Sequence, residues 1–179
     1  MFRTRVGYAG GTAPDPTYRT IGDHTECVQV DFAPELVSYE ELLDAFFGVH
    51  DPTRRAPSTQ YASLVLVHDD AQRVAAEASV RRYSSLFGAQ VLTVVKPLET
   101  FYLAEDYHQK YGLRSEPLLV REMRRYYPDE MGLRESTAAM RLNGFAYEGG
   151  RASLMGREIG SYGLGPEGEA YLKTLAGRR

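Results

Sequence analysis

The sequence predicts an α+β fold in which helices cover one face of a mixed sheet and a helical extension follows. Two observations predict it. Up to about residue 100, segments typical of strands and helices follow in the order strand, strand, helix, strand, helix, strand, and hairpin and crossover connections together give a mixed sheet. From about Gly112 onward every segment is typical of a short helix. We therefore expect a core over residues 1–111 and a helical extension over residues 112–179.

The first two strands are separated by a loop. RTRVGYAGG, residues 3–11, begins as a strand and ends in a Gly-Gly turn, and TAPDPTY, residues 12–18, contains two prolines and is a loop. Residues 25–32 are typical of a strand, which ends at Ala33 and Pro34.

The first helix has a clear start and a clear end. Ser38 and Glu41 have the spacing of a capping box, in which their side chains bond to the free amides of a helix start. The four residues after this box that form one apolar helical face are Leu42, Leu43, Phe46 and Phe47. Gly48 and the His-Asp-Pro at residues 50–52 end the helix.

A strand, a helix and a strand follow. YASLVLVH, residues 61–68, predicts a strand, Asp69 and Asp70 can cap an Ala-rich helix to about Phe87, and Gly88 stops it. VLTVV, residues 91–95, predicts the last strand, which ends at Pro97, and residues 101–111 then form a polar, aromatic loop. The extension contains three helical segments, EPLLVREMRRYYPDE, STAAMRLNG and GPEGEAYLKTLAG.

Composition narrows the class of protein. The 179 residues carry a net charge of −3, so there is no basic footprint for nucleic acid. No apolar run approaches ~18 residues, so no membrane span is expected, and the N-terminus lacks the apolar region of a signal peptide. A single cysteine cannot form an internal disulfide, which favours the cytoplasm.

Cys27 and Glu26 are neighbours in sequence but should point to opposite faces of their strand, since side chains alternate. Cys27 is therefore badly placed to cooperate with Glu26, and we expect a structural thiol. Glu26 shares its face with Val28 and Val30, and a carboxyl at the end of an apolar row would be desolvated and could stay protonated as a general acid. The alternative is a hydrated carboxylate at the edge of the sheet.

A second candidate site is FYLAEDYHQKY, residues 101–111, since binding residues concentrate on loops after strands. The alternative is a polar connection with aromatic anchors. Possible metal ligands are His24, Glu26, Asp106 and His108, but neither H-E-x-x-H nor a cysteine pair is present, so no metal site is expected.

Four segments resemble the A-type peptide methionine sulfoxide reductases, which act on the S epimer of methionine sulfoxide. These segments are GYAGGTAPDPTY (7–18), the stretch from DHTECVQVDF to GVHDP (23–52), TQYASLVLVHDD (59–70) and FYLAEDYHQKY (101–111). The resemblance covers roughly residues 2–111, in the family's order. It implies the family's ferredoxin-like α+β sandwich, here without its first strand and first helix.

The resemblance implies roles for four residues. Glu26 would be the general acid that protonates the sulfoxide oxygen, Tyr18 and Tyr111 would bind that oxygen, and Asp106 would order the site. It also implies an oxidoreductase with methionine sulfoxide in peptides or proteins as substrate, thioredoxin as reductant and no bound cofactor.

The family's nucleophilic cysteine has no counterpart in this sequence. The family's cysteine lies in a Gly-Cys-Phe-Trp-Gly motif at the junction of the first strand and helix, and this chain has neither that motif nor any tryptophan. The family's C-terminal resolving cysteines are absent too, and Cys27 falls on an ordinary strand position. The short link between Tyr18 and Glu26 also resembles a subgroup with a helical extension and serine in place of the nucleophile.

We therefore expect a member of this family that is inactive as given, because it lacks the attacking thiol. The alternatives are a non-catalytic module that binds a sulfoxide or similar polar group, and a remnant that does neither. We expect Met1 to be a mis-assigned start, or else the missing strand to be replaced by a partner or by the extension, since a bare sheet edge is costly.

Overall fold

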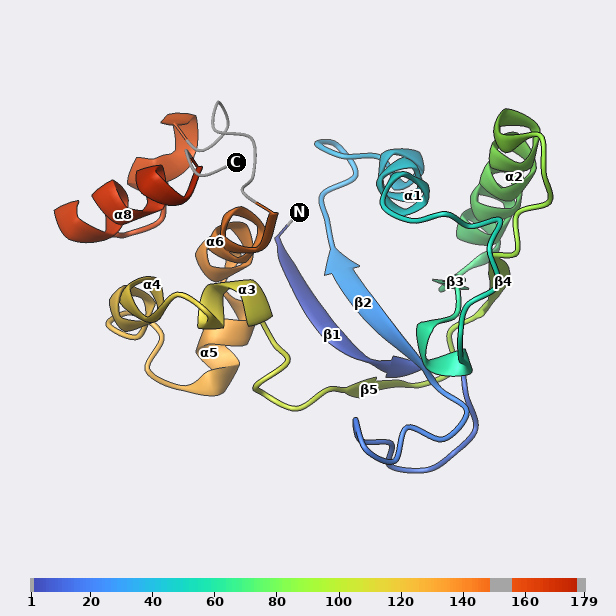
Figure 1. Cartoon of the computed structure of the whole chain (residues 1–179), viewed down its shortest axis with the longest axis horizontal. Coiled ribbons are helices and arrows are strands. Elements are labelled where there is room, and N and C mark those ends of the chain that lie inside the picture. Colours follow the sequence, from blue (N-terminus) through green and yellow to red (C-terminus); the bar gives the residue numbers. More distant parts are fainter. Residues whose placement is uncertain (1, 149–155, 177–179) are drawn as a thin grey trace. The chain divides into compact units, whose positions relative to one another are not determined.

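A computed structural model of the chain describes residues 2–148 and 156–176, and these form two compact units (Figure 1). The sheet unit comprises Val6–Ala104, and the helical unit comprises Met1–Arg5 and Glu105–Arg179. Strand β1, Arg3–Ala9, contributes residues to both. Met1, on which the hypothesis about the start rests, lies outside the described residues. The predicted boundary between residues 111 and 112 stays a prediction.

The sheet unit contains two small sheets. Its further elements are β2 (Thr25–Asp31), α1 (Tyr39–Gly48), η1 (Thr59–Tyr61), β3 (Leu64–Val67), α2 (Asp70–Phe87), β4 (Val94–Pro97) and β5 (Phe101–Leu103). One sheet has the order β2-β1-β5, and the other pairs β3 with β4. Strands β1 and β5 are antiparallel, whereas β3 and β4 are parallel and are joined through α2.

The prediction of one mixed sheet was therefore wrong in this respect. Parallel and antiparallel pairs are both present, but they belong to separate sheets among the described residues. The crossover through α2 builds the parallel pair, and no described strand bridges it to the antiparallel one. The mixed α/β character of the prediction is confirmed.

The two long helices of the sheet unit begin and end where the sequence predicts. Ser38 Oγ accepts a hydrogen bond from Glu41 N at 3.1 Å, and Glu41 Oε2 accepts one from Ser38 N at 2.8 Å, so the capping box is complete. Helix α2 is capped by Asp69, whose side chain accepts from the backbone of residue 72, and stops at Gly88 in the left-handed conformation. The ends of these helices are set by capping residues close to them in the chain, so they can be predicted from the sequence.

The end of the sheet unit differs from the prediction. Strand β4 is Val94–Pro97 and not residues 91–95, and Phe101–Leu103 is a strand, β5, where a loop was expected. Three residues are too few to show the alternation that identifies a strand. Gly7 faces β5, and a Cβ at this position would collide with the carbonyl oxygen of Tyr102 and with the Phe101 ring. Glycine there allows the close approach of the two strands.

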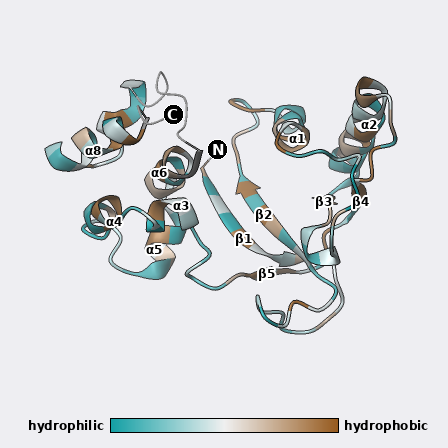
Figure 2. Ribbon diagram, viewed as in Figure 1, coloured by the Kyte–Doolittle hydropathy of each residue, from teal (hydrophilic) through white to brown (hydrophobic). Residues whose placement is uncertain are grey.

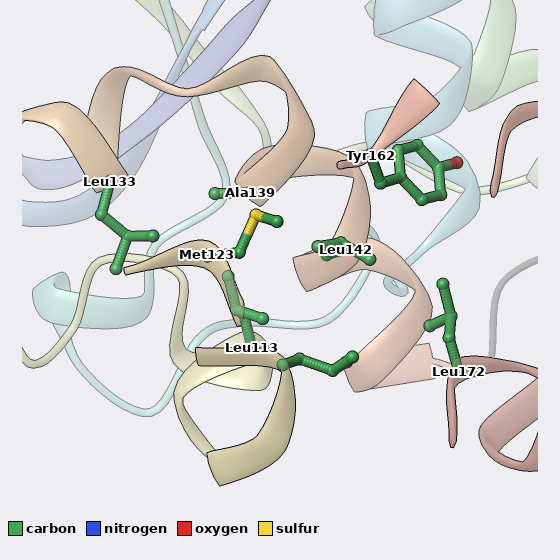
Figure 3. Close-up of a cluster of buried hydrophobic side chains, with 8 residues drawn as sticks. Leu113, Met123, Leu133, Ala139, Leu142, Tyr162 and Leu172 are labelled. Carbon is green, nitrogen blue, oxygen red and sulfur yellow. The ribbon is translucent and has the colours of Figure 1, made fainter. Parts of the chain in front are cut away.

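The helical unit has its own hydrophobic core, and the prediction of a helical C-terminal region is confirmed for its described residues. Its helices are α3 (Tyr111–Arg114), α4 (Pro117–Met123), α5 (Glu130–Glu135), α6 (Thr137–Glu148), the 3-10 turn η2 (Ile159–Ser161) and α8 (Pro166–Ala176). Figure 3 shows side chains from these helices meeting, among them Leu113, Met123 and Leu142, all fully buried. This burial is the main source of the unit's stability.

The first residues of the chain belong to the helical unit by hydrogen bonding. Thr137 Oγ1 donates to the carbonyl oxygen of Phe2 at 2.6 Å, and Lys110 Nζ donates to that of Thr4 at 2.6 Å. Residues 2–5 are thus held by residues more than 100 positions later, a relationship that no local sequence pattern predicts.

Candidate functional site

The one-turn helix η1 lies beside strand β2 and contacts Glu26. Thr25 Oγ1 donates to the carbonyl oxygen of Thr59 at 2.8 Å, which fixes the turn to the strand. Gln60 Nε2 then donates to Glu26 Oε1 at 2.6 Å. The predicted acid therefore has a partner 34 residues away that the sequence analysis did not identify.

The next residue of η1 reaches the predicted oxygen binder. The hydroxyl of Tyr61 is hydrogen-bonded to Tyr18, and this bond is the main reason that the pKa of Tyr61 is raised above its usual value. The negative charge of Glu26 raises it further. Tyr18, Glu26, Gln60 and Tyr61 thus form one group, called here the Glu26 cluster. Both tyrosines are well exposed, at 42% for Tyr18 and 53% for Tyr61.

The environment of Glu26 differs from the prediction. Its side chain is exposed, and Val28 on the same face of β2 is 61% exposed, so the row is not buried. Figure 2 shows hydrophobic residues alternating with hydrophilic ones along β2. The expected desolvation of Glu26 was wrong because no described element covers this face. The alternative of a hydrated carboxyl describes the structure better.

The loop that carries Tyr18 is held by two adjacent side chains. His24 is buried, accepts a hydrogen bond from Gly11 N at its Nδ1 (3.0 Å), and donates from Nε2 to the carbonyl oxygen of Ala13 (2.8 Å). Asp23 accepts from the backbone of Thr12 and Ala13 and from the Thr12 hydroxyl, and these bonds lower its pKa to about 2. Both ring nitrogens of His24 are therefore used within the loop.

Cys27 has the properties of a structural thiol. Its sulfur donates to the carbonyl oxygen of Thr25 at 3.3 Å, and burial raises the pKa of the thiol to about 11. Only the thiolate is an effective nucleophile, and the raised pKa lowers the thiolate fraction of Cys27 at neutral pH. The geometry supports the prediction that Cys27 is not the nucleophile.

The other two predicted site residues lie in the helical unit. Asp106 is half exposed, and its Oδ1 is 3.7 Å from Arg134 Nη1. Tyr111 begins α3 and is 60% exposed. The structure describes these residues and the Glu26 cluster in separate units, so the roles of Asp106 and Tyr111 stay predictions.

Among the described residues no three His, Cys, Asp or Glu side chains are placed to hold a metal ion. None of the described helices has the length and apolar character required to span a bilayer.

Comparison with known proteins decides the family. The sequence model of the family "Peptide methionine sulfoxide reductase" matches residues 1–137. The chain belongs to this family. A peptide methionine sulfoxide reductase of Drosophila melanogaster is 37% identical over 173 residues, which are 96% of this chain and 69% of the fly protein. The MsrA of Methanothermobacter thermautotrophicus is 44% identical over 119 residues, covering 60% of this chain and 70% of that protein.

Solved structures of methionine sulfoxide reductases support the fold. Reduced Mxr1 from Saccharomyces cerevisiae aligns with a TM-score of 0.59 at 32% identity, covering 64% of this chain and 71% of Mxr1. Methionine sulfoxide reductase A of Corynebacterium diphtheriae aligns with a TM-score of 0.53 at 32% identity, covering 64% of each chain. The resemblance stated from the sequence is confirmed as to family.

Proposed function

We propose that this chain binds the sulfoxide group of oxidised methionine in peptides, in the S configuration, and that its 179 residues do not reduce that group by themselves. The observation that carries the proposal is the Glu26 cluster, in which a carboxyl and a tyrosine hydroxyl are brought together and held by η1. Membership of the reductase family supports the choice of ligand.

The chemistry of the cluster suits a sulfoxide oxygen, which is a hydrogen-bond acceptor with partial negative charge. A protonated Glu26 and the Tyr18 hydroxyl can each donate to it. By the family resemblance, Tyr111 would be a further donor and Asp106 would order the site. Glu26 is exposed, so a ligand can reach its carboxyl from the solvent side.

Reduction requires a thiolate that attacks the sulfoxide sulfur while the oxygen takes up protons. With a pKa of about 11, the Cys27 thiol supplies almost no thiolate at neutral pH. Without a sulfenic acid on the protein there is nothing for thioredoxin to reduce, so thioredoxin would be a partner only if another thiol acts. A cytoplasmic location remains part of this proposal.

Isothermal calorimetry with two peptides tests the proposal. A peptide that contains methionine (S)-sulfoxide should bind, and the same peptide with unoxidised methionine should bind much more weakly. Incubation of the chain and the sulfoxide peptide with dithiothreitol should not convert the sulfoxide peptide to the methionine peptide. Equal binding of both peptides would contradict the binding function, and turnover that disappears in Cys27→Ser would contradict the assignment of Cys27 as structural.

A further inference from the structure

We propose that Asp23 is a positioning residue of the sulfoxide site, which places Tyr18 relative to Glu26 by closing the base of the loop that carries Tyr18. This loop runs from Gly10 to His24, between β1 and β2, and Figure 1 shows it extending beyond the ends of both strands. The inference rests on the proposed function and adds one residue to it. Asp23 is not among the residues whose roles the family resemblance implies.

The carboxylate of Asp23 binds the opposite side of the loop through both of its oxygens. Oδ1 accepts hydrogen bonds from Thr12 N at 2.9 Å and from Ala13 N at 3.0 Å, and Oδ2 accepts one from the Thr12 hydroxyl at 2.9 Å. These bonds lower the pKa of Asp23 to about 2, so the group is a carboxylate near neutral pH. Hydrogen bonds to an ionised acceptor are stronger than those between neutral groups, and several on one carboxylate fix its orientation.

The neighbouring residue, His24, closes the base of the loop from its buried side. Its ring accepts a hydrogen bond from Gly11 N and donates one to the carbonyl oxygen of Ala13. Gly11 approaches so closely that a Cβ there would lie 2.5 Å from Asp23 Oδ1 and 2.7 Å from His24 N. The two sides of the loop are therefore in direct contact at residues 11–13 and 23–24, which we call the neck, and glycine at position 11 allows this contact.

The neck determines the position of Tyr18 because the chain between them has little freedom. Two prolines, whose rings fix φ, flank Asp15, which has a φ of 45°. Thr17 and Thr20 then close a turn that contains Tyr18: Thr20 N donates to the carbonyl oxygen of Thr17 at 3.1 Å, and the two hydroxyl oxygens lie 2.7 Å apart. A change in the neck is therefore transmitted to Tyr18.

On its other side the neck leads directly into the strand that carries Glu26. Strand β2 begins at Thr25, which is buried and donates to the carbonyl oxygen of Thr59, so the start of the strand is fixed. Asp23 thus ties the loop of Tyr18 to the start of β2 and hence to Glu26. Without its carboxylate the amides on the far side of the neck would bond to water, and Tyr18 would occupy a wider range of positions relative to Glu26.

The test is calorimetry with a methionine (S)-sulfoxide peptide on a double-mutant cycle of Asp23→Ala and Tyr18→Phe in the full chain. Asp23 is exposed, so alanine there leaves no cavity. Asp23→Ala should weaken binding by about tenfold in the unaltered chain but by less than about twofold in Tyr18→Phe, because the hydroxyl whose position it fixes is already absent. A merely structural role would weaken binding by the same factor in both.

Two further variants complete the design. Asp23→Asn keeps one oxygen that can accept from the neck, so its affinity should lie between those of the unaltered chain and Asp23→Ala. Asp15→Asn makes the same change at an exposed residue of the same loop, whose φ of 45° asparagine also adopts, and should leave the affinity unchanged. Thermal unfolding shows which variants are folded, and the cycle is run with Asp23→Asn if Asp23→Ala is not.

The outcomes separate the two proposals. If the unaltered chain does not distinguish the sulfoxide peptide from the methionine peptide, the proposed function fails. If it does, and Tyr18→Phe weakens binding, the function stands. In that case an equal loss from Asp23→Ala in both members of the cycle, or no loss in either, would overturn the role of Asp23 alone. A Tyr18→Phe variant that binds as well as the unaltered chain would remove Tyr18 from the site and overturn this inference with it.

Discussion

Arg5 and Glu135, which are 130 residues apart in sequence, form a two-point ion pair within the helical unit. Arg5 Nε donates to Glu135 Oε1 at 2.9 Å and Nη2 donates to Oε2 at 2.7 Å. The hydrogen bonds from Arg5 are the main reason that the pKa of Glu135 is lowered to about 2, and Arg134 lowers it further. This pair links the first strand of the chain to the end of α5.

We predict that Glu135→Gln destabilises the protein in a pH-dependent way. The pKa of Glu135 is lowered from 4.5 to about 2 in the folded state, so its contribution is fully present above pH 4.5 and is lost as pH falls toward 2. The shift corresponds to at most about 3 kcal/mol at neutral pH. Urea unfolding at pH 7 and pH 3 measures the difference between the unaltered chain and the variant.

Glu167→Gln is the matched control, because Glu167 pairs with Arg121 in the same unit but both side chains are largely exposed. An exposed pair contributes little, so the control should change the free energy of unfolding by less than about 1 kcal/mol at either pH. If both variants behave alike, the Arg5–Glu135 pair has no special role.

Lys110 is expected to cause a second pH dependence of the free energy of unfolding, which arises from the burial of an amine and not from an ion pair. The residue is buried, and burial, with repulsion from Arg5 and other arginines, lowers the pKa of its amine to about 8. A lowered lysine pKa means that the unfolded chain binds the proton more tightly between pH 8 and 10.5, so stability should rise across that window.

The measurement is the free energy of unfolding at pH 7 and pH 10 for the unaltered chain and for Lys110→Met. Methionine keeps the apolar stem without the charge, so the rise attributable to Lys110, at most about 3 kcal/mol, should disappear in the variant. Lys173→Met, at an exposed lysine of α8, should leave the rise intact. An identical rise in all three proteins would show that Lys110 is not its source.

The accuracy of the sequence predictions depends on whether the relevant interaction is local. The capping box of Ser38 and Glu41 and the stop at Gly88 were predicted because the interacting groups lie within a few residues of one another. Strand β5 was missed because its pairing partner, β1, lies about 95 residues earlier and its three residues carry no period of their own.

The candidate site shows the same limit. The resemblance to a reductase family predicted roles for Glu26 and Tyr18, and strand alternation predicted that Cys27 and Glu26 point to opposite faces of β2; these assignments stay predictions. Gln60 and Tyr61 were not identified, although they lie in a segment that resembles the family, because contact with Glu26 depends on how η1 docks on β2. The exposure of Glu26 depends on what covers a sheet face, which alternation alone cannot predict.

We predict that His24→Phe destabilises the protein through the loop that carries Tyr18. Phenylalanine fills the buried space but leaves the amide of Gly11 and the carbonyl of Ala13 without their imidazole partners. Loss of two hydrogen bonds in a buried place costs about 2–4 kcal/mol. Urea unfolding measures this, and His68→Phe, at an exposed histidine, should cost far less. Equal effects would mean that the imidazole of His24 does not hold the loop.

The reactivity of Cys27 provides the most direct test of the claim that this chain lacks its own nucleophile. Alkylation by iodoacetamide proceeds through the thiolate, so its rate follows the thiolate fraction and the access of the reagent. With burial raising the pKa to about 11, the rate should be low at pH 7 and should continue to rise beyond pH 9 without a plateau. The alkylation rate of a short cysteine-containing peptide, measured in parallel, should level off near the ordinary thiol pKa of about 8.5.

Mass spectrometry of the intact chain gives the modified fraction with time, and Cys27→Ser gives the background. A plateau below pH 8 would mean an activated thiol, and the sulfoxide reduction assay would then have to be repeated with Cys27 as the candidate nucleophile.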